Sequence, residues 1–245
     1  MSSANKRKRD PADELICPIS LELPWDPVTA EDGRVYERIS IETHIKNHPR
    51  GLKSPITNKK MGKKLVPAIQ HRNMTDILVE DGVILGDLAA KWKEKVNQKK
   101  EMEELLKKAD AGGACAMYNL GVNYENGYDG FNEDEKLAFQ WYSRAHKAGN
   151  VRGTSSVGMH LLNGWGVAKN EKLGLVHLSS AAGQGSNYAA KWLGVAFANG
   201  EYGLSVDKAM AISWLEKAVG DCPEGPLTDE SIQDAQQELD ELKSS

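Results

Sequence analysis

One spacing dominates the second half of this 245-residue chain: a glycine that follows an aliphatic residue recurs every 36 to 37 residues. These glycines are Gly121, Gly158 and Gly194, and an Asn-Gly pair follows each of them, at positions 126–127, 163–164 and 199–200. A period in the mid-thirties is typical of helix-turn-helix units that stack on one another, and three units are about the minimum for a stable stack. We therefore predict three helical repeats over residues 111–222.

The residue types at the repeated positions fit helix pairs. Glycine lets two helices approach closely, and Asn-Gly tolerates the left-handed backbone that ends a helix. The second helix of each repeat carries a bulky pair, which is Trp141-Tyr142, His177-Leu178 or Trp214-Leu215. Residues 223–245 predict a capping helix, with Thr228 as its N-cap and four apolar residues on one face, namely Ile232, Ala235, Leu239 and Leu242.

Residues 13–82 form a different, loop-rich segment that holds six of the nine prolines. A turn signal at residues 31–33 between two short extended runs, 28–30 and 34–37, predicts a β-hairpin. A helix capped by Ser40 and a second helix that begins near Pro67 follow. Residues 83–110 are rich in Lys and Glu, and with Asp87 as a cap they predict a connecting helix.

Composition and charge limit the kinds of binding partner and the cellular compartment that we expect for this chain. The formal net charge of −4 gives no reason to expect a nucleic acid or a membrane as a partner. Residues 1–12 predict a disordered basic terminus, whose run from Lys6 to Arg9 is either a nuclear address or a solvated tail. Three scattered cysteines fit a reducing compartment, and no apolar run could span a bilayer or act as a secretory signal. We expect a cytoplasmic location, with the nucleus as the alternative.

An opening segment and five ordered matches between Glu14 and Glu80 resemble a U-box domain. The opening is Glu14-Leu-Ile-Cys-Pro-Ile-Ser-Leu-Glu-Leu23, and the five matches that follow it are Asp26-Pro-Val28, Gly33-Arg-Val-Tyr-Glu-Arg38, Ile41-Glu-Thr-His44, Ser54-Pro-Ile-Thr57 and Leu65-Val-Pro67. The resemblance implies a small, RING-like α+β domain that holds two loops in place without zinc. It implies salt bridges and hydrogen bonds in place of the metal, to which Asp26, Glu37, Arg38 and Glu42 can contribute.

The count of metal-binding side chains agrees with a zinc-free domain. A RING domain needs four Cys or His ligands for each of its two zinc ions. Residues 14–81 contain Cys17 and three histidines, His44, His48 and His71, which cannot fill two such sites. We expect no metal and no other cofactor. Cys17 lies between Ile16 and Pro18 without a cationic neighbour, which favours a structural thiol over a nucleophile.

The repeats resemble the Sel-1-like class, a relative of tetratricopeptide repeats. The first repeat carries the resemblance, with Tyr118-Asn-Leu-Gly121, Tyr124-Glu-Asn-Gly127 and Ala138-x-x-Trp-Tyr142. The complete chain is thus expected to be an α+β U-box followed by an all-α helical-repeat solenoid.

The two resemblances together imply a ubiquitin-protein ligase. Its U-box would recruit a ubiquitin-conjugating enzyme carrying ubiquitin, and its repeats would hold a protein substrate or adaptor. The chain would supply no covalent catalytic residue, because such a ligase acts by proximity and orientation. The positions that match the family's enzyme-binding surface are Ile16, Ile19, His44, Pro55 and Asn58. The U-box could also form a homodimer.

Two alternatives stay open. Ile16 and Ile19 could belong to the core instead of the docking surface, although alternation makes it hard to bury both in one extended segment. Asn58 stands where the family has an arginine or a similar donor, and Ala68 stands where it has asparagine. The second hypothesis is therefore a non-enzymatic interaction scaffold with an inactive U-box-like domain.

Overall fold

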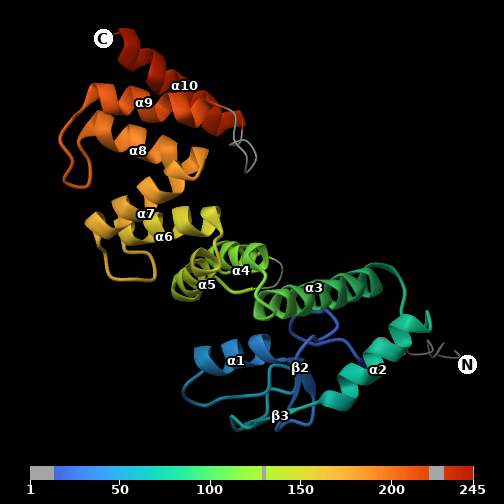
Figure 1. Ribbon diagram of the computed structural model, residues 1–245. Coiled ribbons are helices and arrows are strands. Elements are labelled where there is room, and N and C mark those ends of the chain that lie inside the picture. Colours follow the sequence, from blue (N-terminus) through green and yellow to red (C-terminus); the bar gives the residue numbers. More distant parts are fainter. Residues whose placement is uncertain (1–13, 129–130, 221–228, 245) are drawn as a thin grey trace, which may run out of the picture. The chain divides into compact units, whose positions relative to one another are not determined.

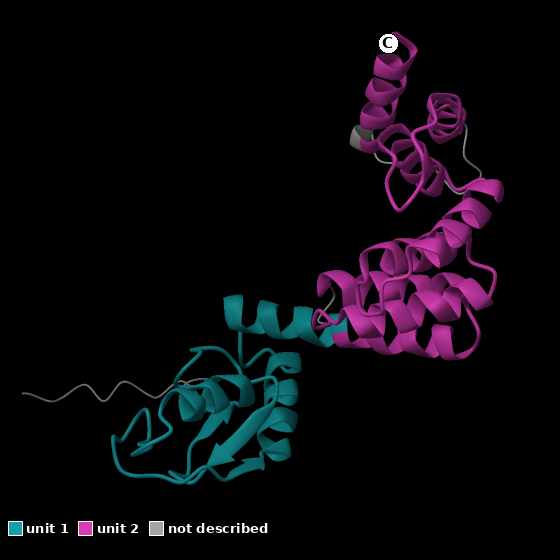
Figure 2. Ribbon diagram, turned by 90° about the vertical axis from the view of Figure 1, so that its left-hand side faces the viewer, with its two compact units in different colours: residues 1–98 teal, residues 99–245 magenta. Residues whose placement is uncertain are grey.

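The computed structural model describes residues 14–128, 131–220 and 229–244. The chain divides into two compact units, residues 1–98 and residues 99–245 (Figure 1, Figure 2). The predicted disordered terminus of residues 1–12 and Thr228, the predicted cap of the last helix, lie outside the described residues. None of the described helices is long and apolar enough to cross a membrane.

The N-terminal unit contains a three-stranded sheet in which β1 (Pro27–Ala30) is the central strand. It pairs antiparallel with β2 (Val35–Glu37) on one side and with β3 (Leu65–Pro67) on the other. The predicted hairpin is confirmed, because Val28 pairs with Tyr36. The third strand was not predicted: residues 65–67 form an edge strand, where proline is tolerated because its missing N–H faces away from the ladder.

Three helices follow the strands in the N-terminal unit or begin there: α1 (Arg38–Asn47), α2 (Ile69–Glu80) and α3 (Gly86–Asp110). All three predicted helices are present, but the roles predicted for the residues at their starts are wrong. Helix α1 begins directly after Glu37, so Ser40 lies inside it. Pro67 ends β3 instead of opening α2. Asp87 lies in the first turn of α3, where its charge favours the helix dipole, and is not its cap.

Two apolar clusters stabilise the N-terminal unit. The first cluster joins the sheet to α1 and to the loops, with Cys17, Val28, Tyr36 and Ile41 all fully buried. The second cluster joins α2 to the first turns of α3 through Val79, Ile84 and Trp92, among others. Trp92 donates from its indole Nε1 to Asp76 at 2.8 Å and packs edge-on against Trp25. The first part of α3 is therefore a component of the N-terminal core.

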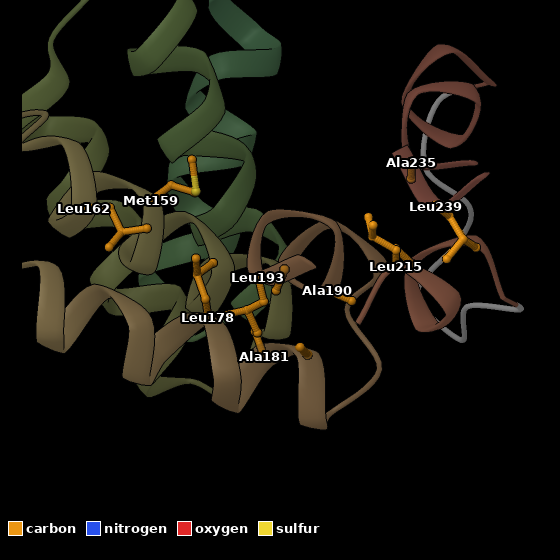
Figure 3. Packing of buried hydrophobic residues seen from close by; sticks show 12 residues of the cluster. Met159, Leu162, Leu178, Ala181, Ala190, Leu193, Leu215, Ala235 and Leu239 are labelled. Atoms are coloured by element: carbon orange, nitrogen blue, oxygen red, sulfur yellow. The ribbon is translucent and has the colours of Figure 1, made fainter. Parts of the chain in front are cut away.

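The repeat unit consists of three helix pairs and a last helix. The pairs are α4 (Ala114–Asn126) with α5 (Glu135–Lys147), α6 (Val151–Asn163) with α7 (Glu171–Gly183), and α8 (Asn187–Asn199) with α9 (Lys208–Val219). Helix α10 (Asp229–Ser244) packs on α9 through Ala235 and Leu239, as the apolar pattern predicted. In Figure 3, side chains from successive helices of this unit meet in one continuous apolar layer, with Leu178 close to Leu193.

The repeated Asn-Gly pairs end the first helix of each pair, as predicted. The glycines after α4, α6 and α8 have left-handed backbones, with φ of 66°, 82° and 71° at Gly127, Gly164 and Gly200. The second helix of each pair begins at a side-chain cap that the sequence analysis did not identify. These caps are Asp134, Asn170 and Asp207, and each carboxylate or amide oxygen accepts from the backbone N–H three residues later.

The other repeated glycines are positions where the two helices touch. A Cβ atom on Gly194 would lie 2.6 Å from Leu215 Cγ, and one on Gly158 would lie 2.9 Å from Leu178 Cγ. Both distances are shorter than a van der Waals contact, so only glycine fits. At Gly121 the neighbour is the ring of Tyr142. The buried member of each bulky pair is thus the second one, while Trp141 and Trp214 are only partly buried and lie under Arg144 and Lys217.

A buried polar network lies inside the repeat stack. His160 is 1% exposed, with Nδ1 at 2.9 Å from the carbonyl oxygen of Trp165 and Nε2 at 3.2 Å from Glu125 Oε1. The Tyr142 hydroxyl donates to the other oxygen of Glu125 at 2.6 Å. The hydrogen bond from His160 lowers the pKa of Glu125, against the opposing effect of burial, and that from Tyr142 lowers it further. The network connects the first repeat to the second.

We predict that Gly194→Ala lowers the free energy of unfolding by about 1–3 kcal/mol, because the added methyl overpacks against Leu215. Urea melts followed by far-UV circular dichroism would measure the change. The matched control is Gly183→Ala, at a helical position with no atom within 4 Å of the new Cβ. This control should be neutral or should stabilise the protein by about 0.4–1 kcal/mol. Equal effects of the two changes would contradict the close-packing explanation.

We predict that Glu125→Gln lowers stability at neutral pH by about 1 kcal/mol, because it removes the charge from the bond to His160. The pKa of Glu125 is lower in the folded protein, so its stabilisation is fully present above the ordinary glutamate pKa. That stabilisation is lost as the pH falls through the folded value. Chemical melts at pH values from neutral to acid should therefore show wild type and variant converging in acid. A constant difference would contradict this account.

Candidate functional site

The first loop of the N-terminal unit, residues 14–26, contains a tight apolar turn at residues 17–22. Its base is fixed because Cys17 N–H donates to the Glu22 carbonyl at 2.8 Å and Leu21 N–H donates to the Cys17 carbonyl at 2.9 Å. The turn between them leaves Ile19 and Leu21 exposed, at 36% and 71%. Leu21 has a left-handed backbone, with φ of 59°. A non-glycine residue in that conformation is uncommon and marks a place where the surroundings force the backbone.

Polar contacts from the sheet and from α2 hold the first loop. The Glu37 carboxylate accepts from the N–H groups of Trp25 and Asp26, at 2.6 and 3.3 Å. His71 Nε2 donates to the Leu15 carbonyl at 3.0 Å, and Arg72 donates to the Trp25 carbonyl at 3.1 Å.

Ion pairs add to these contacts. Arg38 pairs with Asp26 at 2.5 Å and with Glu42 at 3.7 Å. All four charged residues that the U-box resemblance pointed to are therefore engaged around this loop.

The second loop, residues 50–64, is a narrow hairpin whose tip is residues 54–58. Lys53 and Lys60 form an isolated antiparallel bridge at its neck, and Ser54 N–H donates to the Lys59 carbonyl at 2.8 Å. Ser54 Oγ accepts from the N–H groups of Ile56 and Thr57, at 3.2 and 3.0 Å. This leaves Ile56 42% exposed at the tip, next to Pro55.

Two carboxylates, the half-buried Asp32 and the exposed Glu31, fix the second loop to the β1–β2 turn. Asp32 accepts from the Tyr36 hydroxyl at 2.7 Å, and the Ser54 hydroxyl lies near enough to lower its pKa as well. Burial pushes the pKa of Asp32 upward, but these hydrogen bonds outweigh it and hold the pKa below its usual value. Glu31 accepts from the N–H groups of Gly62 and Lys64, at 2.9 and 3.2 Å. Neither carboxylate was predicted to hold a loop, although both belong to the turn signal of residues 31–33.

The bases of the two loops share one core. Cys17, from the base of the first loop, packs in one cluster with Leu52 and Met61, which flank the second loop. Ile41 and Ile45 of α1 belong to the same cluster. The end of α1 also touches the second loop directly, because His44 Nε2 donates to the Lys53 carbonyl at 2.9 Å.

The five residues that the U-box resemblance marked for enzyme binding differ in exposure. Ile19 and Asn58 are exposed, while Pro55 and His44 are half-buried. Ile16 is half-buried and packs against the second apolar cluster, so part of its side chain belongs to the core. Asn58 has a left-handed backbone with φ of 58°, and its N–H donates to the Ser54 carbonyl at 3.0 Å.

Two further exposed apolar side chains extend this surface, and the sequence analysis missed both. Leu21 lies two residues after Ile19 in the first loop, and Ile56 directly follows Pro55 in the second. The sequence signal for them was that each lies in a U-box-like motif, close to a residue already assigned to enzyme binding. We refer to Ile19, Leu21, Pro55 and Ile56 as the two-loop apolar surface.

The chemistry of the site is that of a docking surface. Cys17 is fully buried, and its sulfur lies 3.5 Å from the Ser20 N–H, so it is a structural thiol. Within the part of the chain that the structure describes, no group of three or more His, Cys, Asp or Glu side chains could hold a metal ion. Carboxylates and hydroxyls connect the loops to the sheet.

Comparison with known families identifies both parts of the chain. Residues 12–77 match the U-box domain. Residues 116–150, 155–186 and 187–219 match the Sel1 repeat, one match for each helix pair.

Individual relatives resemble only parts of the chain. The probable bifunctional E2/E3 enzyme R795 of Acanthamoeba polyphaga mimivirus is 33% identical over 89 residues, which are 36% of this chain and 6% of that protein. U-box domain-containing protein 19 of Arabidopsis thaliana is 34% identical over 115 residues, which are 44% of this chain and 15% of that protein. Among solved structures, a Sel1 repeat protein from Oxalobacter formigenes is 28% identical with a TM-score of 0.45, covering 56% of this chain and 98% of its own.

The mimivirus and Arabidopsis relatives are much longer than the part they share with this chain, so they identify its domains and not a whole protein. The order of the two family matches along the sequence agrees with the two structural units. The chain therefore consists of a U-box domain followed by Sel1 repeats.

Proposed function

We propose that this chain is a ubiquitin-protein ligase, in which the two-loop apolar surface binds a ubiquitin-conjugating enzyme. The U-box match implies ligase activity. The observation that carries the proposal for this chain is the joint exposure of Ile19 and Ile56 on loops anchored in one core. Exposed apolar side chains on a small, rigid surface are typical of transient protein interfaces.

The proposed reaction uses no covalent intermediate on this chain. The thioester stays on the conjugating enzyme, and the ligase contributes by holding that enzyme and its ubiquitin in a reactive arrangement. The docking residues would be Ile19, Pro55 and Ile56, with His44 at the border and Ile16 contributing its exposed part. Both loops are held by hydrogen bonds before any partner arrives, which reduces the entropic cost of binding.

Asn58 is the candidate group for restraining ubiquitin. It is exposed at the end of the second loop's tip, and its left-handed backbone is held by the bond to Ser54. An amide can donate a hydrogen bond to a carbonyl of the ubiquitin tail. Because it carries no charge, its contribution should be weaker than that of an arginine at the same place.

The repeats are proposed to hold a protein substrate or an adaptor. In the repeat unit, a depression of about 340 Å³ lies between the second part of α3 and α4. Apolar side chains such as Leu105 and Val122 line it together with amides and with three charged residues, Glu101, Glu104 and Lys108. Such a lining suits an extended peptide segment, whose side chains are apolar and whose backbone needs hydrogen-bond partners. Trp165, at 41% exposed, is a second candidate contact.

We predict that Ile19→Ala and Pro55→Ala each reduce the transfer of ubiquitin from a charged conjugating enzyme to free lysine by about tenfold, because each removes a central apolar contact. The assay would use the full chain with a panel of conjugating enzymes. The matched control is Ile77→Ala, which truncates an isoleucine that is 56% exposed on α2, outside both loops. This control should keep wild-type activity.

Two outcomes would contradict the proposed function. If the folded wild-type chain fails to accelerate transfer from any conjugating enzyme in the panel, the non-enzymatic scaffold is the better description. If Ile77→Ala is as harmful as Pro55→Ala, the two-loop surface is not the docking site.

We predict that a metal chelator leaves the thermal unfolding of the N-terminal unit unchanged, because carboxylates and hydroxyls hold its loops. In contrast, Ser54→Ala should lower the free energy of unfolding by about 1–3 kcal/mol, since it leaves Asp32 and two backbone N–H groups with one partner fewer. Differential scanning calorimetry of the full chain would measure both. A melting transition that the chelator shifts or removes would refute this account.

A further inference from the structure

The U-box domain contains a long stretch without acidic residues. From Thr43 to Thr75 there are eight Lys or Arg residues and no Asp or Glu, although the chain as a whole carries a net charge of −4. Seven of the eight lie between residues 46 and 64, and all seven are exposed: Lys46, Arg50, Lys53, Lys59, Lys60, Lys63 and Lys64. Positive charge is therefore concentrated on and around the second loop.

Three of these lysines stand at the neck of the second loop. Lys53 and Lys60 are direct partners in the antiparallel bridge, and Lys59 is the residue before Lys60. Like charges placed opposite each other across a bridge destabilise it. The tip between them carries Pro55 and the exposed Ile56. We refer to Lys53, Lys59 and Lys60 as the basic rim.

The nearby carboxylates do not neutralise the basic rim. Glu31 accepts from the backbone N–H groups of Gly62 and Lys64, Asp32 accepts from Tyr36, and Glu42 pairs with Arg38. Among the residues that the structure describes, no carboxylate forms an ion pair with Lys53, Lys59 or Lys60. Backbone groups of the rim form hydrogen bonds within the hairpin and with His44. The lysine side chains are exposed, and their ammonium groups face solvent.

We propose that the basic rim selects among conjugating enzymes, favouring those with acidic residues beside their apolar docking surface. This inference rests on the proposed function and names the chemistry of the partner. An apolar centre with a charged border is the common anatomy of a transient protein interface. Complementary charge at such a border raises the association rate and suppresses wrong partners. The rim lysines are specificity-determining residues in this scheme and take no part in the transfer step.

A protein partner fits these observations better than a nucleic acid. Single strands are usually held by aromatic side chains that stack on the bases. Residues 43–75 contain no Phe, Tyr or Trp, while the two-loop apolar surface directly adjoins the rim.

The test measures ubiquitin discharge to free lysine and binding by the full chain, using a panel of purified conjugating enzymes of known surface charge. The variant is Lys53→Glu with Lys60→Glu. The matched control is Lys93→Glu with Lys100→Glu, which makes the same change of net charge at two exposed lysines of α3. Sodium chloride is varied from about 50 to about 300 mM, a range over which screening of exposed charges becomes strong.

With enzymes that have an acidic border, we expect the rim variant to bind roughly tenfold more weakly at low salt and to lose most of its salt dependence. Conjugating enzymes with a basic border should bind the rim variant more tightly than they bind the wild type. The α3 control should behave as wild type. Should the double glutamate variant fold poorly, Lys53→Gln with Lys60→Gln should show about half of the effect on the logarithmic scale.

The outcomes separate the two proposals. If Pro55→Ala abolishes discharge while the rim variant matches wild type with every enzyme, the rim inference is wrong and the ligase proposal stands. If no enzyme is discharged by wild type, both fail. If fluorescein-labelled duplex DNA or single-stranded RNA binds the wild type and not the rim variant, while enzyme binding is unchanged, the rim is a nucleic-acid site and the inference is overturned.

Discussion

The U-box depends on one cluster of hydrogen bonds around a carboxylate. Asp32 accepts from Tyr36 in the sheet and is stabilised by the hydroxyl of Ser54 in the second loop, and Ser54 in turn accepts from the tip of that loop. Burying a carboxylate is costly unless it is bonded in this way. Because one group connects sheet, turn and loop, the exposure of Ile56 at the tip follows from a contact made at the base of that loop.

The repeat unit depends on a constraint of a different kind, which is the absence of a side chain at three repeated glycine positions. At Gly121, Gly158 and Gly194 the partner helix is so close that a methyl group would collide with Tyr142, Leu178 or Leu215. The short distance lets the buried residue of each second helix fill the space between helices, and the same geometry recurs three times along the stack. One buried polar network, between His160 and Glu125, ties the first pair to the second. A rigid stack of this kind offers a fixed surface to a partner.

The two loops of the U-box use charge in opposite ways. In the first loop, ion pairs such as Arg38 with Asp26 are satisfied within the domain and stabilise the position of the loop. At the neck of the second loop, lysines are left without acidic partners beside an apolar tip. Unsatisfied like charges are tolerated there because they are fully hydrated, and they remain available to a partner. The charge that holds the site is thus distinct from the charge that we propose to select its ligand.

Periodicity and motif spacing in the sequence determined the repeat stack, the hairpin and the U-box assignment, because these follow from local residue types. The cap or first-turn roles of three residues were wrong, since Ser40, Pro67 and Asp87 are common near helix ends but also fit inside a helix or an edge strand. Only the tertiary structure decided which residues hold the loops: Asp32 meets Ser54, and Glu31 meets Gly62, across gaps in sequence that no local pattern encodes. It also decided that Leu21 and Ile56 are exposed while Ile16 is partly core, because burial depends on what the rest of the chain packs against each side chain.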